Sequence, residues 1–166
     1  MNLYIDTNVL MKLFIKETYS DEIRRLVESA DLVATGLITR AETAAGINRL
    51  TRMNLVNQRY EPRGKPRTPS AASGGVCIPK GNHTECEAAL NNFRQEWGDY
   101  HRIPVTEQIV IRADFLTGQF SLRGYDAIHL GCALTWSELL GAPVTIATFD
   151  KEFREGAQKS GVEVFP

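Results

Sequence analysis

The chain lacks several features that would assign it to a specialised class of protein. No apolar run approaches the roughly 20 residues that a membrane-spanning helix needs, and no signal sequence is evident at the N-terminus. Cysteine is scarce, and the three that are present cannot all pair with one another. A chain of this size does not require a disulfide framework. These absences lead us to expect a cytoplasmic protein with no membrane partner.

An excess of charge of one sign is also lacking. The sequence holds 19 basic and 20 acidic residues, so the chain as a whole is not a polycation that coats nucleic acid. Any contact with nucleic acid must come from a local basic patch. With 166 residues, 43% of them hydrophobic, the chain can bury a sizeable core. We therefore predict one domain that spans residues 1–166.

Short apolar runs alternate with helical patterns, which is typical of an α/β protein with a parallel sheet. The predicted strands are 3–5, 32–34, 103–105, 144–147 and 162–165; the predicted helices are 9–14, 19–30, 39–53, 87–97, 106–117, 125–140 and 151–159. Thr18 is a candidate N-cap of the second helix. Thr39 and Glu42 fit the capping-box pattern at the start of the third.

A segment at about 54–81 interrupts this alternation. It is rich in Pro, Gly and Ser from Pro62 onward and carries basic residues at Arg63, Lys65, Arg67 and Lys80. Without an apolar face to bury, it is predicted to be a loop insertion. The pattern allows two interpretations, a solvated insertion or a basic flap that contacts phosphates.

Four carboxylates stand at the edges of apolar runs, where helices are predicted to begin. They are Asp6 in YIDTNVL, Glu42 in TRAET, Asp126 in GYDAIHL and Asp150 in ATFDKEF. Asp6 and Asp150 directly follow predicted strands. The carboxyl ends of parallel strands share one edge of a sheet, and ligands bind at that edge. We therefore expect the four side chains to converge.

Each of these acids can be interpreted singly as a helix cap or as a charge that complements a helix dipole. Their convergence favours a different interpretation, because neighbouring carboxylates repel each other and Ser or Asn would cap a helix without that repulsion. A divalent cation relieves it. The pattern therefore predicts an Mg²⁺ or Mn²⁺ site that activates water for phosphodiester hydrolysis, with all four acids as metal ligands and catalytic residues.

The chain resembles the PIN domain family, in particular the toxin ribonucleases of bacterial VapC-type toxin–antitoxin pairs. The resemblance rests on YIDTNVL, TRAET, LRGYDAIHLGCAL, TIATFDKEF and GVEVF, and covers nearly the whole chain except about 54–81. It implies a three-layer α/β fold with a parallel central sheet flanked by helices. It also implies Mg²⁺- or Mn²⁺-dependent cleavage of RNA, and a homodimer inhibited by a small cognate antitoxin protein. The acidic quartet of the family falls on Asp6, Glu42, Asp126 and Asp150.

Other polar residues lie close to these motifs. Asn8 and Thr148 match polar positions that line the pocket in the family. Arg123 precedes the Asp126 helix and could contact phosphate, pair with a site carboxylate or simply lie on the surface. His129 shares a helical face with Asp126 and could donate to a ligand carboxylate, but we interpret it as a partly buried residue outside the site.

Other functions use related patterns. A haloacid-dehalogenase-like phosphatase also places Asp after its first strand, but needs a second Asp two positions later, where this chain has Asn8. A signalling receiver domain carries adjacent acids, whereas Thr7 follows Asp6 here. The intact quartet argues against a non-catalytic binding module. A PIN nuclease of RNA processing, outside the toxin systems, would have the same site.

Overall fold

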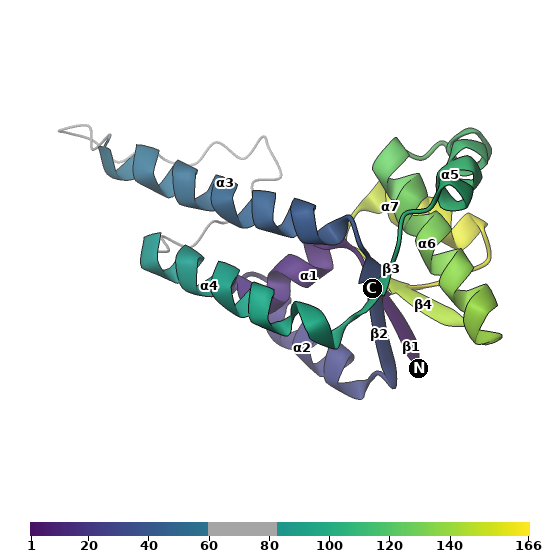
Figure 1. Cartoon of the computed structure of the whole chain (residues 1–166), viewed down its shortest axis with the longest axis horizontal. Coiled ribbons are helices and arrows are strands. Elements are labelled where there is room, and N and C mark those ends of the chain that lie inside the picture. Colours follow the sequence, from purple (N-terminus) through teal and green to yellow (C-terminus); the bar gives the residue numbers. More distant parts are fainter. Residues whose placement is uncertain (60–82) are drawn as a thin grey trace.

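The computed structural model describes residues 1–59 and 83–166. Five parallel strands form its central sheet in the order β3-β2-β1-β4-β5 (Figure 1). The strands are β1 Asn2–Ile5, β2 Leu32–Gly36, β3 His101–Ile103, β4 Val144–Ala147 and β5 Glu163–Phe165. The chain extends the sheet outward from β1 to β3, then crosses back and continues with β4 on the other side of β1. The carboxyl ends of β1 and β4 therefore flank the switch point at which open α/β sheets bind ligands.

Within the described residues, seven α-helices cover the two faces of the sheet, and the predicted three-layer α/β fold is confirmed. On one side lie α1 Thr7–Phe14, α2 Ser20–Ser29, α3 Thr39–Arg59 and α4 His83–Glu96, with a 3-10 turn at Trp97–Asp99. On the other side lie α5 Glu107–Phe120, α6 Gly124–Leu140 and α7 Lys151–Lys159. Figure 1 shows α3 and α4 running side by side beyond the edge of the sheet. None of the helices in the described ranges is long and apolar enough to cross a membrane.

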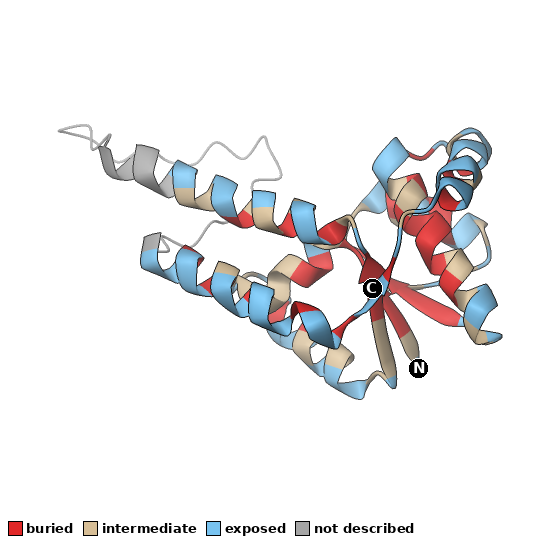
Figure 2. Ribbon diagram, viewed as in Figure 1, coloured by how far each residue is buried: buried red, intermediate tan, exposed pale blue. Residues whose placement is uncertain are grey.

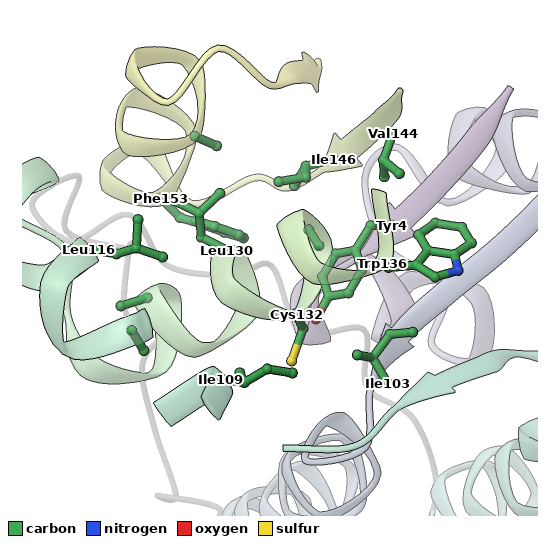
Figure 3. Packing of buried hydrophobic residues seen from close by; sticks show 14 of the residues in the cluster. Tyr4, Ile103, Ile109, Leu116, Leu130, Cys132, Trp136, Val144, Ile146 and Phe153 are labelled. Carbon is green, nitrogen blue, oxygen red and sulfur yellow. The ribbon is translucent and has the colours of Figure 1, made fainter. Parts of the chain in front are cut away.

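The alternation of side chains along β1 divides the core in two. Leu3 and Ile5 are fully buried and pack with Phe93 under α1 to α4. Tyr4 points to the opposite face, where it packs with the cluster beneath α5 to α7 that includes Trp136 (Figure 3). Figure 2 shows β1 and β4 largely buried, and burial on both faces explains why these central strands are mainly apolar.

The structure corrects two details of the predicted elements. The third strand spans His101–Ile103 rather than 103–105, because Pro104 has no N–H with which to continue the ladder. Thr18 does not cap α2: the N-cap position is Tyr19, with a left-handed φ of 72° and no side-chain cap. The Ser20 hydroxyl organises this turn instead, accepting from the Glu17 N–H and donating to the Ile15 carbonyl.

The helix α3 continues through Arg59, beyond its predicted end at 53 and into the segment predicted as an insertion at about 54–81. The rest of the segment, with its basic residues Arg63, Lys65, Arg67 and Lys80, lies outside the described residues.

Candidate active site

Asp6 and Asp150 meet at the switch point of the sheet through Thr148. The Asp6 N–H donates to the Ala147 carbonyl at 3.3 Å, which extends the pairing of β1 with β4 by one residue. The fully buried Thr148 hydroxyl donates to Asp6 Oδ2 at 2.6 Å and accepts from the Asp150 N–H at 3.1 Å. The structure thus places Thr148 between the two acids and brings the ends of β1 and β4 together.

Both acids also cap helices, as the sequence predicts. Asp6 Oδ1 accepts from the Val9 N–H at 2.8 Å at the start of α1, and Asp150 Oδ1 accepts from the Phe153 N–H at 3.0 Å at the start of α7. An ionised carboxylate offers about four lone-pair sites. A capping bond therefore leaves acceptor capacity for a cation.

Asp126 lies in the first turn of α6 and is electrostatically linked to the other two aspartates. Its pKa is raised by burial and by the charges of Asp150 and Asp6, against the lowering effect of Arg123 and His129. The pKa of Asp6 is also raised, chiefly by burial, although the Thr148 and Val9 hydrogen bonds oppose the rise. The ionised forms of Asp6 and Asp126 are thus disfavoured at this edge of the sheet, and a bound cation would relieve this.

The fourth acid, Glu42, faces this group from the first turn of α3. Its Oε2 accepts a hydrogen bond from the Thr7 hydroxyl and lies 3.3 Å from Nε2 of His129. The capping-box interpretation is therefore wrong, since the carboxylate is turned to these side chains and not to the Thr39 amide. Burial alone would raise the pKa of Glu42, but the bonds to His129 and Thr7 lower it below its usual value.

His129 and Thr7 are the polar neighbours that the sequence analysis left out of the site. His129 is 4% exposed and stands between Glu42 and the Tyr4 hydroxyl, which lies 2.9 Å from Nδ1. Its spacing of three residues from Asp126 was the available signal. Thr7 had no signal beyond its place next to Asp6, because only the packing of α1 on α3 brings it to Glu42.

A cavity of about 740 Å³ adjoins the acids. Glu42 and Asp150 contribute to its wall, as does Asn8, one of the predicted pocket residues. Its remaining lining combines apolar and charged side chains: Thr7, Met11, Lys12, Glu17, Gly46, Arg49, Leu50, Met53 and Phe149. The site therefore opens onto a partly apolar hollow with basic groups in its wall.

Arg123 points away from this cavity and toward α7. Its guanidinium pairs with Glu152 at 2.9 Å, in an ion pair whose side chains are 68% and 56% exposed. It remains near enough to Asp126 to lower the pKa of that carboxyl. An exposed pair of this kind is weak, so Arg123 is available to an incoming anion.

Oxygen donors of the kind that Mg²⁺ and Mn²⁺ prefer are therefore gathered at one edge of the sheet. Within residues 1–59 and 83–166, however, no three Asp, Glu, His or Cys side chains already form a group that could hold a metal ion. The acids instead bond to Thr7, Val9, Thr148, Phe153 and His129. The residues fit such an ion in donor chemistry and in charge.

The chain is similar in sequence and in fold to several known proteins. Ribonuclease VapC45 of Mycobacterium tuberculosis is 23% identical over 169 residues, which cover 99% of this chain and 94% of that protein. A toxin–antitoxin complex from Klebsiella pneumoniae has a similar fold, with a TM-score of 0.55 and 19% identity over 92% of this chain and 90% of that chain. The crystal structure of FitAcB from Neisseria gonorrhoeae is also similar, with a TM-score of 0.57 and 16% identity. The match covers 99% of this chain and 96% of that chain. The sequence profile of the PIN domain family matches residues 3–159, and the chain is therefore a member of that family, distantly related to VapC ribonucleases.

Proposed function

We propose that this protein is a metal-dependent endoribonuclease and the toxin of a toxin–antitoxin pair. The observation that carries the proposal is the meeting of Asp6 and Asp150 at Thr148, at the switch point of the sheet. Asp126 belongs to the same group, since burial and the charges of Asp150 and Asp6 raise its pKa. Asp6, Glu42, Asp126 and Asp150 would hold Mg²⁺ or Mn²⁺, the ions on which PIN domains typically depend. When bound, the ion supplies an activated water and neutralises charge on the leaving oxygen.

The chain's own residues prepare this edge for an RNA phosphate. Thr148 holds Asp6 and Asp150 in register, and Thr7 holds Glu42. The adjoining cavity is large enough for part of an unpaired nucleotide, and its apolar wall suits a base that has left its stack. Cleavage would then favour single-stranded RNA or a loop.

The partner proteins belong to the same proposal. The similar structures from Klebsiella pneumoniae and Neisseria gonorrhoeae support a cognate antitoxin for this chain, because the first is a toxin–antitoxin complex and the fold is shared along nearly the whole chain. A homodimer would bury exposed apolar side chains of α5, where Ile111 is 52% and Phe115 70% exposed. A PIN nuclease of RNA processing would share the chemistry but lack the antitoxin.

Incubation of total RNA with purified protein tests the nuclease directly. We expect discrete fragments with Mg²⁺ or Mn²⁺ and none with EDTA. Because water and not the 2′-hydroxyl is the nucleophile, the products should end in 5′-phosphate and 3′-hydroxyl groups. Products with 2′,3′-cyclic phosphate ends, or cleavage that persists in EDTA, would contradict the mechanism.

Arg49 is the basic residue of the cavity best placed to attract a phosphate. Lys12 is held by Glu17 at 3.0 Å, whereas Arg49 has no acidic partner within the described ranges. Arg49→Ala should therefore raise KM for RNA with little change in kcat, and reduce the slope of log affinity against log salt by about one. Arg52→Ala is the matched control, since Arg52 is exposed on the same helix and does not line the cavity. Equal effects of the two substitutions would refute a specific role.

A further inference from the structure

A buried chain of polar side chains leads from the core to Glu42. Tyr4 is fully buried in the middle of the sheet, and its hydroxyl lies 2.9 Å from Nδ1 of His129. The other ring nitrogen of His129, Nε2, lies 3.3 Å from Oε2 of Glu42. This series of side chains thus connects the central strand β1, through His129 of α6, to the first turn of α3.

The hydrogen-bonding capacities of these groups define the direction of the chain. A carboxylate that binds a cation is ionised and only accepts hydrogen bonds, so Nε2 must carry a proton to bond with Glu42. In a neutral imidazole Nδ1 is then an acceptor. The Tyr4 hydroxyl lies 2.9 Å from Nδ1 and can donate one hydrogen bond, so it is the donor that this nitrogen meets. Tyr4 therefore selects the tautomer of His129 that donates to Glu42.

The neighbours of Tyr4 hold its hydroxyl in place. Figure 3 shows the Tyr4 side chain close to Cys132 of α6. On the side of β2, a Cβ at position 36 would stand 3.0 Å from the Tyr4 hydroxyl oxygen, so Gly36 provides the space that this oxygen needs.

We propose that His129, oriented by Tyr4, is a positioning residue that fixes the Glu42 carboxylate at the edge of the candidate metal site. The proposal rests on the proposed nuclease function, since it assigns Glu42 a ligand's role. It also explains why a histidine is buried beside the acids without belonging to the apolar core. Partners that orient metal ligands in this way typically contribute 10- to 100-fold to metal affinity or activity.

Two substitutions separate positioning from simple packing. His129→Leu removes the donor to Glu42 at similar volume, whereas His129→Gln places an amide N–H near the position of Nε2. By titration calorimetry we expect Mn²⁺ affinity to fall about 10- to 100-fold in the Leu variant and to recover largely in the Gln variant. RNA cleavage should follow the same order in kcat more than in KM. A folded Leu variant with wild-type Mn²⁺ affinity would overturn the proposal, as would equal losses in both variants.

The tautomer of His129 can be read without any substitution. Long-range ¹H–¹⁵N correlation in the metal-free protein should show a proton on Nε2. Nε2 without a proton would overturn the proposal even if His129→Leu fails to fold. In Tyr4→Phe, Nδ1 loses its donor, so we expect less of the Nε2–H tautomer together with weaker Mn²⁺ binding.

Comparison of wild type with Asp6→Asn distinguishes a failure of the positioning role from a failure of the proposed nuclease function. If wild type binds Mn²⁺ and cleaves RNA, Asp6→Asn does neither and His129→Leu behaves as wild type, only the positioning role is refuted. If wild type neither binds Mn²⁺ nor cleaves RNA, the nuclease proposal fails and the role of His129 fails with it.

Discussion

Asp126→Asn should lower the rate of RNA cleavage on the order of 10³-fold or more while leaving the fold intact. Asn has nearly the volume of Asp, and Asp126 lies at a helix start where a polar amide is tolerated. The substitution removes one negative charge, and with it one proposed metal ligand, from the group that includes Asp6 and Asp150. A metal ion contributes several kcal/mol to the transition state of hydrolysis, and each 1.36 kcal/mol corresponds to about a tenfold change in rate.

Asp6→Asn should have the same effect on cleavage, and Asp114→Asn should have none. Asp114 is exposed on α5 and belongs to none of the four motifs, so its substitution makes the same chemical change outside the site. The measurement is the initial rate on one RNA with Mn²⁺ in excess, with circular dichroism to verify folding. Substantial activity in either site variant would exclude a shared metal centre.

The largest effect on stability should be seen in the melting temperatures of wild type and Asp126→Asn. The variant should have the higher Tm without metal, and wild type should have the higher Tm with metal. In EDTA at neutral pH, Asp126→Asn should unfold at a higher temperature than wild type, because the Asp126 carboxylate is partly buried beside Asp150 and Asp6. With Mn²⁺ at about one hundred times its Kd, binding adds about 2.7 kcal/mol to wild type. That gain corresponds to a rise in Tm of about 5–10 °C for a domain of this size. The variant should lose most of it.

The direction of the pH dependence follows from the same pKa. The pKa of Asp126 is raised in the folded state, so its contribution to stability is fully present below the ordinary pKa of Asp and is lost as the pH rises through the raised value. Acidification from neutral pH should therefore reduce the difference in Tm between metal-free wild type and metal-free Asp126→Asn. A Tm difference that increases on acidification would show that the Asp126 carboxylate is favourably paired even without metal.

Asp6 and Asp150 stabilise the fold as helix caps and are also proposed metal ligands. Their capping role makes such a site hard to recognise from single residues. Asp6 and Asp150 are helix caps by every geometric measure, each accepting from an amide three residues later. Interpreted one at a time, they need no further explanation. Their shared contact with Thr148 supports the additional role proposed above, because caps chosen for stability alone would not be gathered where carboxylates repel one another.

The sequence alone determined the parallel α/β architecture, because apolar runs of strand length alternate with helical patterns and that alternation leaves few other arrangements. It also identified the acids at the ends of β1 and β4, since a residue that directly follows a parallel strand lies at the ligand-binding edge wherever the strand sits in the sheet. Local chemistry was sufficient for these points. It was misleading at β3, where Pro104 stops the ladder earlier than the apolar pattern suggests.

Only the tertiary structure decided the contacts of Glu42 and His129. Their partners come from β1, α1, α3 and α6, and no local spacing encodes how α6 and α3 face each other across the sheet. The sequence pattern predicts that the Glu42 carboxylate bonds to the Thr39 amide. In the structure it bonds to His129 instead, because packing brings that histidine within reach. Burial then excludes water from the Tyr4–His129 pair, so that each polar group must find a protein partner.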